Sequence, residues 1–180
     1  MTLALVTPPA VEPVTLPEIK RHLRVTDAHE DAYLLDLALA ARTHVEHAAG
    51  RKLVTQVWRR YATGAREPIP LLVGPVQRVA AVTAYDADGR AAALEPGDWT
   101  LWDECLALAP GISASNGVEI DVVAGYGDAP ADVPPTLRRA ILLLVAHGHE
   151  FRGAVAPDDQ PVAIPPGFDA LVAPHRRITL

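Results

Sequence analysis

The sequence has one cysteine, two lysines and 5% aromatic residues, and these scarcities narrow what the protein can be. The lone thiol of Cys105 can form neither an internal disulfide nor a cysteine cluster for a metal ion. The longest apolar run, residues 140–146, has seven residues, whereas about 18 are needed to span a bilayer. Residues 1–10 lack the positive charge and long apolar stretch of an export signal, so we expect neither export nor a membrane anchor.

Positive charge is also scarce in one long stretch of the chain. The 180 residues, 49% of them hydrophobic, can supply a core for one domain or for a domain with a sizeable insert. Between Asp86 and Asp132, ten acids and one base give a net charge of −9, within a total of −6. Because phosphate neutralisation dominates affinity for DNA, this sign argues against a sequence-reading DNA binder. The acidic stretch is either a solvated, loop-rich face or a surface past which DNA slides without sticking.

Two helices are predicted near the N-terminus. Thr15 and Glu18 have the spacing of a capping box, which predicts a helix start at Thr15. A second cap, Asp27 with Glu30, precedes apolar residues spaced three and four apart, and Gly50 suits the end of that helix. The short joint between them predicts an antiparallel helical hairpin.

The middle of the chain, residues 53–127, has the pattern of an antiparallel β structure. Short β-branched or aromatic stretches alternate with Gly, Pro, Asp and Asn. Val118, Ile120 and Val122 alternate with acids, as expected of a half-buried strand. A proline pair beginning at Pro134 then suits a first helical turn, and the apolar run that follows predicts a helix buried around most of its circumference.

These segments predict an α+β fold. We expect a helical bundle of two N-terminal helices plus one long C-terminal helix, with an inserted small antiparallel β unit and an extended C-terminal tail. The predicted parts are an N-terminal arm with the helical hairpin (1–52), the inserted antiparallel β unit (53–127), a buried helix completing the bundle (128–152), and a proline-rich docking tail (153–180).

The predicted tail has an unusual end. It contains five prolines and allows only a turn of helix, over residues 167–172, so it buries little of itself. Its end is nevertheless apolar and basic, and such a segment either binds a partner or folds back on the body of the protein. We favour a partner, with the contact residues Phe168, Leu171, Arg176, Arg177, Ile178 and Leu180.

The sequence carries no catalytic or metal-binding pattern strong enough to assign a site. His44 and His47 lie three residues apart on the second predicted helix, but the chain has no His-Glu-x-x-His spacing to support a metal site. No phosphate loop, nucleophile elbow or carboxylate pair is present. The three tryptophans are expected to pack inward. We therefore expect no catalytic residue, no cofactor and no metal, and a protein that is not an enzyme.

Two segments resemble the head-to-tail connector, or adaptor, family of tailed bacteriophages and gene transfer agents. The first runs from Val14-Thr15-Leu16-Pro17-Glu18 to Gln56-Val57-Trp58, and the second runs from Val118 to Arg152. Together they cover about half of the chain. The visible departure is His149, where the family pattern has an aromatic residue.

The resemblance implies a structural connector that forms a ring beneath the portal and links the DNA-filled head to the tail. It implies a ring matched to a dodecameric portal, with the six tail residues docking on the portal protein and a stopper or tail-completion protein on the opposite face. DNA would pass through the lumen without specific binding. The expected location is the neck of a virion or gene transfer agent particle. Before assembly, the protein would be in the bacterial cytoplasm. The alternative is a non-viral protein-binding module that uses the same C-terminal tail.

Overall fold

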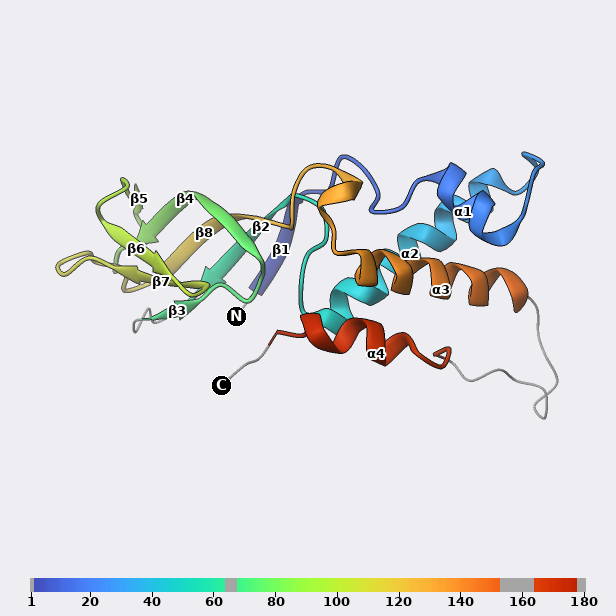
Figure 1. Cartoon of the computed structure of the whole chain (residues 1–180). Coiled ribbons are helices and arrows are strands. Elements are labelled where there is room, and N and C mark those ends of the chain that lie inside the picture. The colour runs from blue at the N-terminus through green and yellow to red at the C-terminus, as the bar shows by residue number, and fades with distance from the viewer. Residues whose placement is uncertain (1, 64–67, 153–163, 178–180) are drawn as a thin grey trace. The chain divides into compact units, whose positions relative to one another are not determined.

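The computed structural model describes residues 2–63, 68–152 and 164–177 (Figure 1). The chain forms two compact units. We call residues 1–10 and 55–126 the β domain, and residues 11–54 and 127–180 the helical domain. Each domain is therefore built from segments that are far apart in the sequence.

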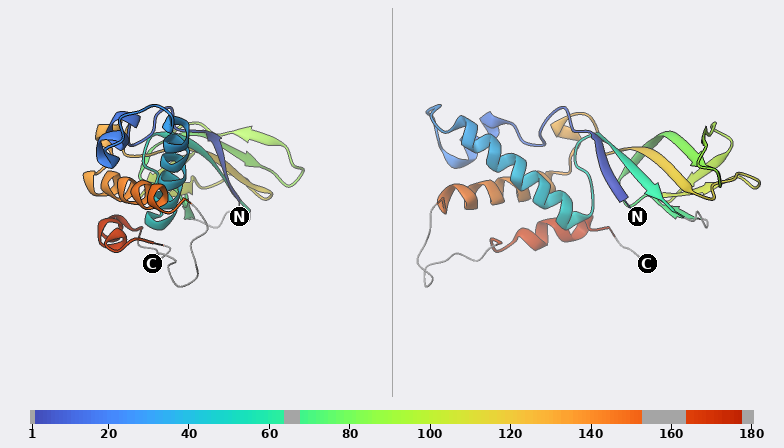
Figure 2. Two further views of the ribbon diagram at one scale, coloured as in Figure 1. Left: turned by 90° about the vertical axis from the view of Figure 1, so that its right-hand side faces the viewer. Right: turned by 180° about the vertical axis from the view of Figure 1, so that it is seen from behind.

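Four α-helices make up the described part of the helical domain. They are α1 (Leu16–Leu23), α2 (Asp31–Ala49), α3 (Pro135–Glu150) and α4 (Phe168–Val172), with 3-10 turns at Pro130–Asp132 and Ala173–His175. Helix α3 packs against the other three, and α4 runs alongside it (Figures 1 and 2). None of the helices in the described residues has the length and apolar character to cross a membrane.

The helix boundaries follow from local capping. The Glu18 carboxylate accepts hydrogen bonds from the backbone N–H and the hydroxyl of Thr15, both at 2.9 Å, so α1 starts where predicted. Helix α2 starts later than the Asp27 cap predicts, because the Asp27 carboxylate accepts the His29 N–H at 3.0 Å and closes a turn ahead of the helix. As predicted, α2 ends at Gly50, whose φ of 62° is left-handed.

The apolar sides of the four helices form one core. Its most buried large residues are Ile19, Leu34, Val45, Leu137, Ile141, Phe168 and Val172. The prediction of an extended C-terminal tail is wrong for the described part of that segment, because α4 folds back and buries Phe168 and Val172. The prediction that α3 is buried around most of its circumference is also wrong, since residues 142–144 remain half-exposed.

Two antiparallel sheets form the β domain. The five-stranded sheet has the order β1 (Thr2–Thr7), β2 (Gln56–Ala62), β8 (Gly117–Ala124), β4 (Val76–Tyr85) and β5 (Ala91–Ala93). The three-stranded sheet has the order β3 (Ile69–Pro70), β7 (Cys105–Leu108) and β6 (Trp99–Trp102).

Strand β8 lies at the centre of the larger sheet and has the predicted alternation. Val118, Ile120 and Val122 are buried in the core of the β domain. On the opposite face, Asp121 receives two hydrogen bonds from Arg59 of β2, at 2.7 and 2.8 Å. The period of two in this segment therefore separates a core face from a charged face.

A buried arginine ties the two sheets together. Arg60 of β2 is fully buried and donates from Nε to the Pro70 carbonyl of β3 at 3.2 Å. Its Nη1 donates to the Tyr61 carbonyl at 2.6 Å. Burial lowers the pKa of Arg60, because the charged form loses hydration.

The β part is more substantial than the small insert predicted from the sequence. Strand β1, within the predicted N-terminal arm, joins the larger sheet by pairing with β2, with Thr2 opposite Tyr61 and Leu3 opposite Arg60. The sequence did not reveal β1 because it is an edge strand with almost no buried face, and Leu5 and Val6 remain about half exposed, at 47% and 48%.

Candidate partner-binding surfaces

The predicted apolar contact residues at the C-terminus have different environments. Phe168 is 1% exposed, and its ring centroid lies 5.3 Å from that of His44 on α2. Leu171 is half-buried. Ile178 and Leu180 lie outside the described residues. Phe168 is thus a core residue of the helical domain rather than a free contact for a partner.

The predicted basic residues lie nearer to the surface. Arg176 is exposed, and its guanidinium lies 2.6 Å from the Asp169 carboxylate. Arg177 is half-buried, and its backbone N–H donates to the Ala49 carbonyl of α2 at 2.8 Å. The fold therefore holds the backbone of Arg177 against the end of α2.

A charged network joins the end of α3 to the start of α2. Glu30 accepts hydrogen bonds from Arg152, and the His149 ring nitrogen lies 3.0 Å from the same carboxylate. The Arg152 guanidinium also lies 4.8 Å from the ring centre of Tyr33, which donates to the Gly148 carbonyl at 3.1 Å. The bonds from Arg152, followed by His149, lower the pKa of Glu30 to about 2. His149 thus takes part in the contact between α3 and the start of α2.

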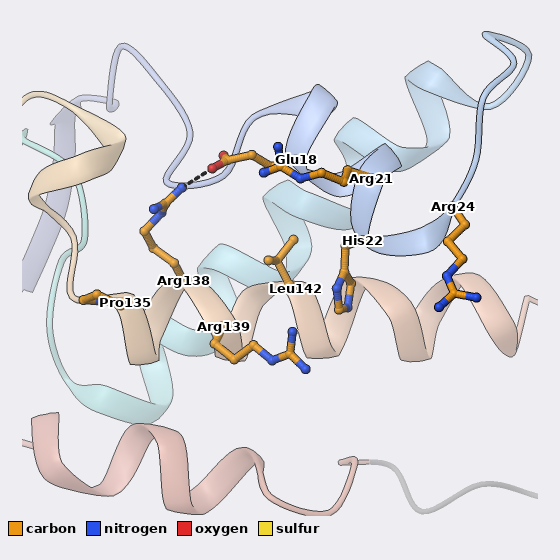
Figure 3. Close-up of a pocket in the computed structure, with 8 residues that line it drawn as sticks. All are labelled: Glu18, Arg21, His22, Arg24, Pro135, Arg138, Arg139 and Leu142. Carbon is orange, nitrogen blue, oxygen red and sulfur yellow. Dashed lines mark hydrogen bonds and ion pairs between the residues drawn. The ribbon is translucent and has the colours of Figure 1, made fainter.

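A groove of about 510 Å³ lies between α1 and α3 (Figure 3). We call it the basic groove, and its lining residues are Glu18, Arg21, His22, Arg24, Pro135, Arg138, Arg139 and Leu142. The one carboxylate in it already has a partner, because Glu18 lies 2.5 Å from Arg138. The Thr15 N–H, and then Arg138, lower the pKa of Glu18. This carboxylate does not neutralise the remaining arginines.

The remaining charges of the basic groove favour an anion. Arg21, Arg24 and Arg139 are exposed, and within the described part of the chain no carboxylate pairs with them. Burial, followed by the charge of Arg139, lowers the pKa of His22 and so favours its neutral imidazole. Half-buried Leu142 adds an apolar surface. The groove suits a carboxylate or phosphate next to an apolar group.

The turn between β6 and β7 presents acidic and apolar side chains together. Trp102 pairs with Cys105, so Asp103 and Glu104 are the two turn residues. Their φ values are 44° and 61°. Leu101 and Trp102, which precede the turn, are 38% and 49% exposed. We call residues 101–104 the acidic hairpin. The exposure of Trp102 shows that the inward packing predicted for the tryptophans is wrong for this residue.

Neither surface was identified from the sequence. Arg21 lies on α1 and Arg24 is its C-cap residue, whereas Arg139 is more than a hundred residues away, so only the packing of α1 on α3 brings them together. A usable signal for the acidic hairpin was the Asp103-Glu104 pair between two aromatic or apolar stretches. No group of three potential metal ligands occurs among the described His, Cys, Asp and Glu residues.

Comparisons with known proteins relate the chain to a family. Residues 13–94 match the family described as phage gp6-like head-tail connector protein. The match covers just under half of the chain and, with the solved structures described next, identifies a head-tail connector protein. No curated protein matches the connector significantly.

Solved structures match the connector over its whole length. A chain from the virion of a native gene transfer agent particle is 28% identical, with a TM-score of 0.81. A chain from the neck of the empty particle, computed with C6 symmetry, is 27% identical with a TM-score of 0.81. A third, from the neck of the native particle computed with C12 symmetry, is 29% identical with a TM-score of 0.76. Each match covers 100% of the connector and 97% of the other chain.

The comparisons distinguish between the functions proposed from the sequence, which were a structural connector, a non-viral binding module and an enzyme. The matched family is one of structural connectors, so the expectation that the protein is not an enzyme is confirmed. The connector reading is likewise confirmed over the non-viral binding module.

Proposed function

We propose that the connector forms a ring in the neck of a phage-like or gene transfer agent particle, beneath the portal. The observation that carries this proposal is the full-length likeness to chains of particles whose necks were computed with C6 and C12 symmetry. A ring of twelve copies satisfies both symmetries. Such a ring joins the head to the tail and leaves an axial path for DNA.

The portal is the proposed partner on one face of the ring, with a stopper or tail-completion protein on the other. We assign portal contact to the end of the chain, from Leu171 through Arg176 and Arg177 to Ile178 and Leu180. The exposure of Arg176 and the hydrogen bond that holds Arg177 on α2 support this assignment. Arginines in such positions pair with carboxylates of a partner.

Phe168 has a different role in this proposal. Because its side chain is buried against α2 and α3, it contributes as an anchor and not as a portal contact. The anchored helix α4 sets the place from which the last residues leave the helical domain. A fixed starting point lowers the entropic cost of docking the remaining residues.

Co-sedimentation of the full chain with purified portal rings tests the portal assignment. We expect the wild type to sediment with portals. The double variant Arg176→Glu with Arg177→Glu should lose this co-sedimentation, and so should a chain that lacks residues 178–180. Arg90→Glu is the matched control, because Arg90 is an exposed arginine of the β domain. Circular dichroism checks that each variant is folded.

Each outcome has a separate meaning. Wild-type protein that does not sediment with portals overturns the portal as partner. Tail variants that sediment as well as the wild type overturn the assignment of the contact to the C-terminus. Loss with Arg90→Glu as well shows a general effect of charge and also overturns that assignment.

A further inference from the structure

The connector carries two surfaces of opposite character. The basic groove offers three arginines without ion-pair partners in the described residues, next to the apolar surface of Leu142. The acidic hairpin presents the exposed carboxylate of Asp103 beside exposed Leu101 and Trp102, with half-buried Glu104 next to it. Each surface therefore combines charge with apolar area, and the charges are opposite.

A closed ring requires two such surfaces on every copy. In a cyclic assembly with more than two copies, neighbours meet through unlike patches, so one patch on each copy must fit a different patch on the next. An isologous contact, in which a patch meets itself, closes a dimer and does not build a ring of six or twelve.

The conformation of the acidic hairpin indicates a role beyond turning the chain. A two-residue turn with positive φ at both positions favours Asn-Gly or Asp-Gly. Here Glu104 has a φ of 61°, in the left-handed region that costs a non-glycine residue about 1–2 kcal/mol. Leu72 nearby also has a φ of 60° and is 42% exposed. Non-glycine residues held in this region cluster at functional surfaces.

We propose that the acidic hairpin of one connector docks in the basic groove of the next copy around the ring. Asp103 pairs with one of Arg21, Arg24 and Arg139, and Trp102 covers Leu142. This inference rests on the ring proposed above. The occupant of the groove is a second copy because the chain itself supplies the complementary charge and apolar area.

DNA is the competing anion for the same arginines. Phosphates would leave Leu142 of the groove uncovered and Trp102 of the hairpin without a partner. The chain's net charge of −6 also opposes the approach of a polyanion. These observations favour the acidic hairpin over nucleic acid as the occupant of the basic groove.

The decisive variant replaces Asp103 by Asn and Glu104 by Gly. This replacement supplies the preferred turn residues, so we expect thermal stability to be unchanged or higher. It removes both acidic side chains, so we expect loss of rings on portals, as seen by electron microscopy. Asp88→Asn with Glu95→Gln is the matched control, because it removes two exposed acids elsewhere in the β domain and should leave rings intact.

Charge exchange then identifies the pair. Asp103→Arg alone should abolish rings, and combining it in the same chain with one of Arg21→Glu, Arg24→Glu or Arg139→Glu should restore them. A purely structural role of Asp103 predicts no restoration. In addition, a photo-crosslinker in place of Trp102, in an equal mixture of isotope-labelled and unlabelled chains, should link one copy to α1 or α3 of another.

Wild-type protein that forms no ring on portals overturns the proposed function and this inference with it. If the wild type forms rings and the Asn-Gly variant does too, only this inference is overturned. Failure of all three exchanges to restore rings, or crosslinks from residue 102 to other elements alone, also overturns it. Loss of duplex DNA binding in Arg21→Glu with Arg139→Glu, with rings intact, assigns the groove to DNA instead.

Discussion

Replacing Phe168 by alanine tests whether the C-terminal segment is part of the folded helical domain. Phe168 is 1% exposed and stacks at a tilt against His44, with ring centroids 5.3 Å apart. Truncating a fully buried phenylalanine costs about 3–5 kcal/mol of unfolding free energy. Because α4 is a short segment near the chain end, the unfolding free energy lost in Phe168→Ala cannot exceed the free energy that holds α4 on α2 and α3. Beyond that point α4 detaches while the remaining helices stay folded.

The chain offers a matched control for this replacement. Its other phenylalanine, Phe151, is 42% exposed, so Phe151→Ala should cost about 1 kcal/mol or less. Urea denaturation followed by far-ultraviolet circular dichroism measures both variants, and hydrogen exchange of α4 amides detects detachment. Tryptophan fluorescence reports the β domain, where all three tryptophans lie. Equal midpoints for the two variants would refute the packing of α4 on the helical domain.

Three further predictions follow from capping, titration and net charge. Thr15→Ala should lower the unfolding free energy by about 1 kcal/mol through loss of its bonds to Glu18, and an unchanged urea midpoint would contradict the cap. Glu30 has a folded-state pKa lowered from 4.5 to about 2, so its stabilising bonds are complete above pH 4.5 and are lost as the pH falls toward 2. Denaturation across this range should show less pH dependence in Glu30→Gln. Duplex DNA should not bind at physiological salt, and a gel shift at micromolar protein with a steep salt dependence would contradict this.

Local sequence signals predicted the helical domain best. The Thr15 cap, the left-handed Gly50 and the proline pair at Pro134 each act within one helical turn, so they mark boundaries without knowledge of the fold. Strand β1 carries no such signal, because an exposed edge strand shows its nature only through pairing with β2. The sequence left open whether the C-terminus folds back, since the burial of Phe168 depends on a surface made by distant helices.

The candidate surfaces were harder to predict than the fold. Arg21 and Arg139 join one groove only because α1 packs on α3. The exposure of Trp102 also depends on the tertiary fold, because it is set by which face of the three-stranded sheet is covered. The resemblance to the connector family came from segments on either side of the middle of the chain, and the acidic hairpin lies between those segments.

Electron microscopy of the purified connector, with and without portal rings, tests directly whether the connector forms a ring beneath the portal. We expect an additional ring of density on one end of each portal, with the twelvefold or sixfold symmetry reported for the similar necks. Portals that remain undecorated at connector concentrations well above those of the portal would contradict it.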